Sequence, residues 1–173
     1  MGFRNTYDDL AYADAYARLE FPGTYYLAYR DLPAIIGAHV SGRRAVDFGC
    51  GTGRSTRFLR SLGFDAVGLD IAADMIGKAA ELDPGDDYRL VGEGDLGGLP
   101  GGSFGLVLSV FTFDNIPADR KAGILTGLRG LLAPDGRIVN LVSSPDVYTH
   151  ECASFSSQDF PENPDARPGD IVR

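Results

Sequence analysis

The stretch VDFGCGTG, residues 46–53, decides the fold class of this 173-residue chain. An apolar strand end leads directly into a turn made of three spaced glycines, Gly49, Gly51 and Gly53. Glycine lacks a Cβ atom and accepts positive φ angles, so the backbone can turn sharply and lie against a ligand. The helix that follows presents unpaired N–H groups. The stretch therefore predicts a strand, a turn and a helix start that together bind a nucleotide-like cofactor.

Strand and helix patterns alternate along the rest of the chain. Short apolar runs predict five strands, at residues 45–48, 66–69, 88–91, 104–110 and 137–142. The clearest helix pattern begins near Pro117 and ends where residues 133–136, APDG, turn the chain. Strands that alternate with helices form a parallel sheet covered on both faces. We therefore expect a doubly wound, Rossmann-like α/β domain whose ligand site lies at the carboxyl ends of its strands.

Two classes of cofactor use this geometry, and the glycine spacing separates them. A dinucleotide-binding loop follows G-x-G-x-x-G, but the position of its third glycine is Arg54 here. The observed pattern is an acid, Asp47, followed by glycine at every second position from Gly49. It resembles the first motif, (D/E)-x-G-x-G-x-G, of class I S-adenosylmethionine-dependent methyltransferases. A nicotinamide-dependent oxidoreductase is the less favoured alternative, and a cofactor-binding or interaction domain without turnover is another.

Further segments carry this resemblance, which covers roughly residues 45–142. They are Asp70 after the second predicted strand, EGDLGGLPGGSFGLVLS at residues 93–109, and LAPDGRIV at residues 132–139. The resemblance implies that Asp70 binds both ribose hydroxyls, since one carboxylate can accept from two hydroxyls, and that Asp95 meets the adenine amino group. The cofactor-binding residues implied in this way are Asp47, Gly49, Cys50, Gly51, Gly53, Asp70, Ile71, Met75, Gly94, Asp95, Leu96 and Ser109.

The resemblance also implies that S-adenosylmethionine brings an already activated methyl group. Holding the acceptor in line with that group and excluding water then supply much of the acceleration, so a general base is optional. The candidate catalytic bases are Asp114 and His150. For Asp114 the alternative is a cap on the helix near Pro117, and for His150 it is a place in a polar surface loop.

The acceptor site is predicted from residues outside the glycine turn. The segment before the first strand is rich in tyrosine and resembles the lid of family members, although aromatic residues at helical spacing also pack in cores. The candidate acceptor-site residues are Tyr12, Tyr16, Tyr25, Arg30, Phe113 and Asn115. Arg30 is expected to meet the methionine carboxylate. We therefore predict methyl transfer to the oxygen or nitrogen of a small molecule.

The composition of the chain excludes several classes of binding partner. With 16 Lys and Arg against 24 Asp and Glu, the net charge is -8, which argues against nucleic acid and anionic membranes as partners. The two cysteines, Cys50 and Cys152, indicate neither a disulfide framework nor a metal site, and Cys50 is interpreted as a small buried filler. No apolar run reaches the ~20 residues of a membrane span, and the N-terminus lacks the apolar core of a signal peptide. We therefore expect a cytoplasmic protein.

The chain is expected to form one domain in three parts. These are an N-terminal helical lid at residues 1–43, the cofactor-binding core at 44–143 and an irregular tail at 144–173. Family members add a sixth and a seventh strand, which are absent or truncated here. The fifth strand would then expose an edge, which predicts a homodimer. The basic residues of the first core helix are expected on a solvated face: Arg54, Arg57 and Arg60.

Overall fold

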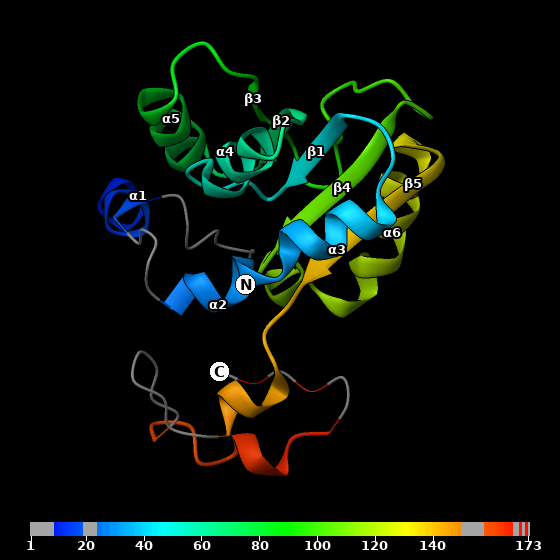
Figure 1. Ribbon diagram of the computed structural model, residues 1–173. Coiled ribbons are helices and arrows are strands. Elements are labelled where there is room, and N and C mark those ends of the chain that lie inside the picture. Colours follow the sequence, from blue (N-terminus) through cyan, green and yellow to red (C-terminus); the bar gives the residue numbers. More distant parts are fainter. Residues whose placement is uncertain (1–8, 19–23, 150–157, 168–169, 171, 173) are drawn as a thin grey trace.

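The centre of the fold is a five-stranded parallel sheet with the order β3-β2-β1-β4-β5 (Figure 1). The computed structural model describes residues 9–18, 24–149, 158–167, 170 and 172. The strands are β1 (Arg44–Phe48), β2 (Asp65–Asp70), β3 (Tyr88–Leu90), β4 (Phe104–Val110) and β5 (Leu132–Leu141). The strand order changes direction at β1, between β2 and β4, which creates the switch point where doubly wound sheets bind ligands. The predicted α/β class is confirmed.

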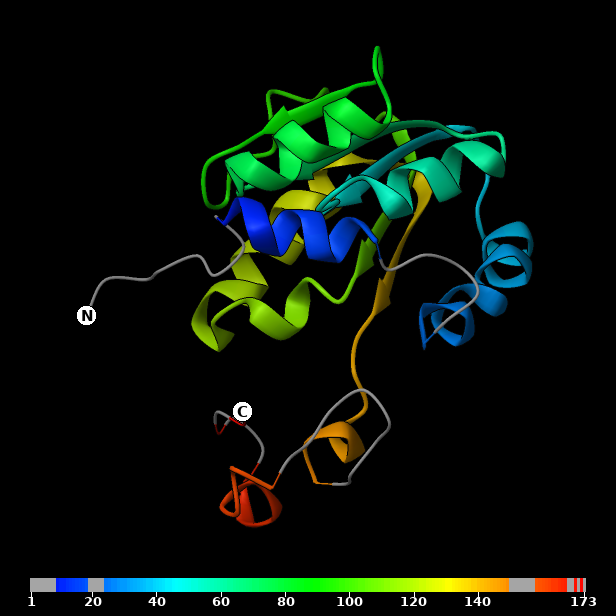
Figure 2. The ribbon, with the colours of Figure 1, turned by 90° about the vertical axis from the view of Figure 1, so that its left-hand side faces the viewer.

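Six α-helices accompany the sheet in the described part of the chain. They are α1 (Leu10–Ala17), α2 (Thr24–Arg30), α3 (Leu32–His39), α4 (Arg54–Ser61), α5 (Ala73–Leu82) and α6 (Ala118–Leu131). Short 3-10 helices follow β4 and β5, namely η1 (Phe113–Asn115), η2 (Pro145–Tyr148) and η3 (Asn163–Asp165). Figure 1 shows α1 on the same side of the molecule as α4 and α5, and α6 on the other side, and Figure 2 shows α1 beside α5.

Two hydrophobic cores form because side chains alternate across the sheet. In β1, Ala45 belongs to the core that includes residues of α3 and α4, whereas its neighbour Val46 belongs to the core that includes residues of α6. All seven residues of β4 are buried. A strand buried on both faces has no polar side to alternate with, which explains the continuous apolar run in the sequence.

The fifth strand begins earlier than predicted. β5 starts at Leu132 and so includes residues 133–136, which the sequence predicts as a turn before the strand. Its pairing with β4 jumps from Phe104–Leu132 to Leu106–Arg137. Pairing with β4 is present before these residues, at Leu132, and after them, from Arg137. The predicted turn residues therefore form an irregularity within the strand.

The basic face of α4 is not solvated as predicted. The Arg60 side chain is only 21% exposed, and its guanidinium pairs with Asp83 at 3.0 Å and with Asp86. It also donates to the Ala66 carbonyl oxygen at 2.8 Å. Arg60 thus joins α4 to β2 and to the segment after α5, because it meets polar groups that are distant in sequence.

The tail contains no sixth or seventh strand among its described residues, and β5 is an edge of the sheet. η2 and η3 lie apart from the sheet (Figure 1). The buried side chain of Asn163 links them, because its Nδ2 donates to the Tyr148 carbonyl oxygen at 3.0 Å. The homodimer expected from the open edge stays a prediction.

Three further observations concern the described residues. None of their helices has the length and apolar character that crossing a bilayer requires. No group of three or more His, Cys, Asp and Glu side chains among them is arranged to hold a metal ion. Cys50 is a free thiol and only 4% exposed, which confirms its interpretation as a buried filler.

Candidate functional site

The glycine turn follows β1, as predicted. Gly49, Gly51 and Gly53 adopt φ angles of 77°, 54° and 80°, which residues with a side chain rarely adopt. A Cβ atom at Gly49 would also lie 2.1 Å from Thr112 Oγ1, so this position has no room for a side chain. The Gly49 N–H donates to the Leu69 carbonyl oxygen at 2.8 Å. The neighbouring strand β2 therefore supports the turn.

Asp70, the last residue of β2, holds the same turn. One carboxylate oxygen, Oδ2, accepts from the Gly51 N–H at 2.8 Å, and the other, Oδ1, accepts from the Ala72 N–H at 2.9 Å. The carboxylate is thus fixed between the glycine turn and the start of α5. Because each carboxylate oxygen carries two lone pairs, this arrangement is compatible with the ribose contact, which stays a prediction.

Asp47 is fully buried in β1, just before the turn. Its Oδ2 accepts from Ser55 Oγ at 2.7 Å and from Thr56 Oγ1 at 2.6 Å, both in the first turn of α4. Its Oδ1 has no hydrogen-bond partner among the described residues. Burial raises the pKa of Asp47 to about 6, although the two hydroxyls oppose the rise. A buried carboxylate with one unpartnered oxygen is therefore built in beside the turn.

Two other buried hydroxyls near the site also have no partner within the described part of the chain, Thr52 Oγ1 and Ser109 Oγ. A buried polar atom without a hydrogen-bond partner lowers the stability of the fold by about 1–3 kcal/mol, and native proteins contain few such atoms. Ser109 is fully buried in β4, so it offers no surface for the predicted cofactor contact in this structure. Arg57 Nη1 donates to the Thr52 carbonyl oxygen at 2.9 Å, and this arginine therefore supports the turn.

The loop after β3 contains the residues predicted to meet adenine. Gly94 has a φ of 77°. The exposed Asp95 accepts at Oδ1 from the Gly97 N–H at 3.0 Å, which closes a tight turn. Leu96 packs partly buried against the core that includes residues of α6. The loop is thus anchored with Asp95 at its surface, and the contact of Asp95 with adenine stays a prediction.

Phe111, the residue after β4, has a strained backbone with a φ of 58°, the only positive value among the described residues other than glycine. Its N–H donates to the Leu141 carbonyl oxygen at 2.8 Å, and its own carbonyl oxygen accepts from Asn115 Nδ2 at 3.1 Å. Thr112 Oγ1 donates to the Phe48 carbonyl oxygen at 3.1 Å. Strain held by its surroundings is typical of functional sites. Asn115 supports this turn through its Nδ2, and its contact with the acceptor stays a prediction.

The next two residues also differ from expectation. Phe113 is 4% exposed and packs against Phe48 with ring centroids 6.0 Å apart, so its ring belongs to the core and not to an acceptor pocket. Asp114 Oδ2 accepts from both the N–H and the Oγ of Ser143 at 3.1 Å, which ties the segment after β4 to the segment after β5. The capping alternative for Asp114 is wrong, because α6 follows Pro117 without a side-chain cap.

The N-terminal helix α1 packs against α5. Ala13 and Met75 are buried in one small cluster, and Lys78 pairs with Asp14 at 2.8 Å. Met75 is 2% exposed, since it packs in this cluster, and its contact with the cofactor stays a prediction. These contacts fix α1 beside the carboxyl ends of the strands.

Aromatic rings extend from the glycine turn to the end of β4. A Cβ atom at Gly51 would lie 3.7 Å from Tyr16 Cε1. The Tyr16 ring meets the Tyr25 ring edge to face at 6.2 Å, and Tyr25 meets Phe111 in the same way at 5.9 Å. Burial, reinforced by the neighbouring phenol of Tyr25, raises the pKa of Tyr16. The structure therefore brings two predicted lid residues, Tyr16 and Tyr25, to the site.

Arg54 is the site residue that sequence reasoning missed. It is the first residue of α4, and its Nη2 donates to the Tyr16 carbonyl oxygen at 2.9 Å. Its Cζ lies 5.2 Å from the centre of the Tyr16 ring and 4.4 Å from that of Tyr25. The only signal was an arginine directly after the glycines in a chain with a tyrosine-rich N-terminal segment. The predicted solvated position is wrong because these rings cover the guanidinium.

The remaining predicted residues are engaged locally, exposed or not described. Arg30 donates to both carboxylate oxygens of its neighbour Asp31, at 2.9 and 2.8 Å, so its guanidinium is engaged locally. Ile71 and Tyr12 are 40% and 44% exposed. His150 lies outside the described residues.

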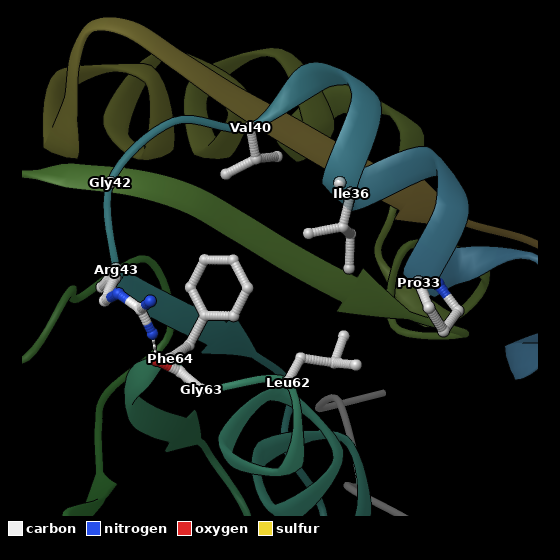
Figure 3. Close-up of a pocket in the computed structure, with 9 residues that line it drawn as sticks. Pro33, Ile36, Val40, Gly42, Arg43, Leu62, Gly63 and Phe64 are labelled. Carbon is white, nitrogen blue, oxygen red and sulfur yellow. Dashed lines mark hydrogen bonds between the residues drawn. The ribbon is translucent and has the colours of Figure 1, made fainter.

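A cavity of about 470 Å³ lies at the opposite end of the sheet. Its wall includes Ile36 of α3, Val40 directly after α3, Phe64 before β2 and Arg43 before β1 (Figure 3). Arg43 Nη1 donates to the Gly63 carbonyl oxygen at 3.2 Å within this wall. Because the cavity lies at the amino ends of the strands, it is separate from the glycine turn at their carboxyl ends.

A family model described as a methyltransferase domain matches residues 46–140 of the chain. The match begins at the strand end before the glycine turn and ends within β5. It therefore covers more than half of the 173 residues and includes both Asp47 and Asp70.

Curated relatives of this chain are methyltransferases by name. It is 41% identical over 69 residues to malonyl-[acyl-carrier protein] O-methyltransferase of Pectobacterium atrosepticum, which is 40% of this chain and 26% of that protein. It is 33% identical over 109 residues to ubiquinone biosynthesis O-methyltransferase of Methylococcus capsulatus, which is 60% of this chain and 45% of that protein. The chain thus spans less than half the length of these curated relatives.

A solved structure shows the same likeness. An S-adenosylmethionine-dependent methyltransferase from Mesorhizobium loti is 28% identical, with a TM-score of 0.55 over 68% of this chain and 54% of that chain. This similarity agrees with the sheet order, the glycine turn and the family match, which all indicate a methyltransferase domain. The chain belongs to the methyltransferase domain family.

Proposed function

We propose that the chain binds S-adenosylmethionine at the glycine turn and transfers its methyl group to an oxygen or nitrogen atom of a small molecule. One observation carries the proposal: Asp70 holds a glycine turn at the carboxyl ends of adjacent parallel strands, within the segment that matches the methyltransferase domain. Ligands of doubly wound sheets bind at this edge. The name of the solved relative, an S-adenosylmethionine-dependent enzyme, supports the choice of cofactor.

The residues around the turn fit such a cofactor. A Cβ atom at Gly51 would meet only Tyr16, at 3.7 Å, so the missing side chain there leaves the backbone accessible to a ligand, and the start of α4 presents N–H groups. The negative charge of Asp47 favours a cation close to the turn, and S-adenosylmethionine carries a sulfonium. We propose that Asp70 accepts hydrogen bonds from the ribose hydroxyls and that Asp95 accepts one from the adenine amino group.

The acceptor is proposed to be small and bound beside the aromatic rings. When bound, S-adenosylmethionine supplies an activated methyl group, and the chain contributes orientation and exclusion of water. Tyr16, Tyr25 and Phe111 offer ring faces and edges that suit a flat acceptor. Oxygen as the methylated atom is supported by the names of the two curated relatives, both O-methyltransferases. The net charge of -8 argues against a nucleic-acid acceptor.

Isothermal titration calorimetry with S-adenosylmethionine, S-adenosylhomocysteine and NAD tests the cofactor. We expect the first two to bind and NAD not to bind, because Arg54 replaces the third glycine of a dinucleotide loop. Binding of NAD alone would contradict the proposal. Formation of S-adenosylhomocysteine over a panel of phenols, carboxylates and amines then separates an enzyme from a domain that only binds the cofactor.

The Asp114→Asn substitution tests the predicted general base. We expect methyl transfer to fall less than tenfold, because the carboxylate is engaged by Ser143 and asparagine keeps an oxygen that can accept from the same groups. Removal of a general base lowers rates by about 10²–10⁴-fold. Initial rates of S-adenosylhomocysteine formation measure the effect, and urea unfolding shows whether the variant is folded. A hundredfold loss in a folded variant would make Asp114 the base.

A further inference from the structure

Arg54 joins two parts of the chain that are distant in sequence. It begins α4, directly after the glycine turn, yet its guanidinium contacts residues of α1 and α2. One N–H group donates to the main-chain carbonyl of Tyr16, which is the next-to-last residue of α1. The ring faces of Tyr16 and Tyr25 lie against the same cation. A single side chain therefore connects the turn with both helices.

The contacts of Arg54 restrain the positions of the two tyrosine rings. The hydrogen bond fixes the backbone of Tyr16, whose ring lies beside Gly51. The cation against Tyr25 holds that ring between Tyr16 and Phe111. A cation on an aromatic face is attractive and directional. Loss of the guanidinium would therefore release the orientation of Tyr16 and Tyr25 together.

Other contacts hold α1 but do not replace this role. Lys78 pairs with Asp14 on the side of α1 that faces α5, and Ala13 packs beside Met75. These contacts keep α1 on the core without fixing the Tyr25 ring of α2. Arg54, at the start of α4, contacts residues of both α1 and α2.

We propose that Arg54 is a positioning residue that holds α1 and α2 over the glycine turn, so that Tyr16 and Tyr25 form the acceptor side of the site. This proposal rests on the proposed function in one respect only, the identity of the cofactor and acceptor that the site binds. The physical coupling between Arg54 and the N-terminal helices is a property of the folded chain and is measurable without a cofactor.

Amide hydrogen exchange of Arg54→Gln, Arg54→Lys and the wild type tests the coupling. In Arg54→Gln we expect exchange of residues 24–30 to be at least fivefold faster, with β1 and β4 unchanged. Lysine keeps a cation and a donor, so Arg54→Lys should recover part of the protection. Arg43→Gln, in the wall of the cavity at the other end of the sheet (Figure 3), is the matched control and should exchange as the wild type does.

A second measurement follows the rings themselves. The chain contains 8 tyrosines and no tryptophan, so its near-ultraviolet circular dichroism reports the packing of tyrosine. We expect Arg54→Gln to lose part of this signal and Arg43→Gln to keep it. Tyr25→Leu removes one ring without changing α4 and should produce the same local exchange pattern. Unchanged exchange of residues 24–30 in a folded Arg54→Gln or Tyr25→Leu variant would overturn the proposal.

Binding of S-adenosylhomocysteine separates this proposal from the proposed function. We expect Arg54→Gln to bind it at least fivefold more weakly than the wild type does, with partial recovery in Arg54→Lys. Wild type that binds no S-adenosylhomocysteine would contradict the proposed function, while the exchange result would still decide the role of Arg54. Equal affinity in wild type and Arg54→Gln would refute a role of this arginine at the site.

Discussion

Asp70→Asn is expected to weaken the binding of S-adenosylhomocysteine by about 1–3 kcal/mol, nearly as much as Asp70→Ala. The reason is that each carboxylate oxygen accepts from a backbone N–H, one from Gly51 and one from Ala72. An asparagine has only one accepting oxygen, so its NH₂ group would face one of these N–H groups and repel it. The usual conservative substitution should therefore disturb the turn as well as remove a partner of the ribose.

Calorimetry on Asp70→Asn, Asp70→Ala and Asp65→Asn measures this effect. Asp65 begins the same strand, is exposed and lies at the opposite end of β2, so its substitution should leave the affinity unchanged. Urea unfolding of the same proteins separates a weakened site from a weakened fold. Wild-type affinity in a folded Asp70→Asn variant would show that neither the turn nor the cofactor depends on the charge of Asp70.

The parts of the fold that the sequence predicts are those set by neighbouring residues. The strand β4 is buried at all seven positions, and its sequence is apolar except for Ser109. The glycine turn is equally local, because positive φ angles and the lack of room at Gly49 leave few alternatives to glycine. Such features need no knowledge of distant partners.

The failures involve partners that are distant in sequence. Arg54 meets Tyr16 across 38 positions, and Asp114 meets Ser143 across 29. An arginine on a helix surface or an acid before a helix has an ordinary local interpretation, and only the folded chain replaces it. The predicted start of β5 is wrong for the same reason, because β5 pairs with β4 both before and after residues that locally favour a turn.

Backbone strain explains the remaining mismatch after β4. Phe111 has a φ of 58°, a value that the sequence gives no reason to expect for a bulky residue. The strained turn sends Phe113 into the core and leaves Phe111 beside Tyr25. The sequence predicts Phe113 for the acceptor site, whereas Phe111 is the residue whose ring lies beside Tyr25.

Asp47 is expected to make the free energy of unfolding fall by about 2 kcal/mol as the pH rises from 4 to 7.5. Burial raises its pKa from 3.8 to about 6. Below the ordinary pKa both folded and unfolded chains hold the proton. Between the two values the unfolded chain loses it while the folded chain keeps it, so folding becomes less favourable as the pH rises. Above the folded pKa the loss is complete.

Urea unfolding of wild type and Asp47→Asn at several pH values isolates this contribution as the difference between the two proteins. The asparagine oxygen can still accept from Ser55 and Thr56, so the fold should be kept. The stability of wild type relative to the variant should therefore decrease steadily between pH 4 and pH 6 and then level off. Asp31 is the matched control, because Arg30 lowers its pKa, and Asp31→Asn should produce a smaller difference of opposite sign. A difference between wild type and Asp47→Asn that does not change with pH would mean that the carboxylate titrates normally, and the raised pKa would then be refuted.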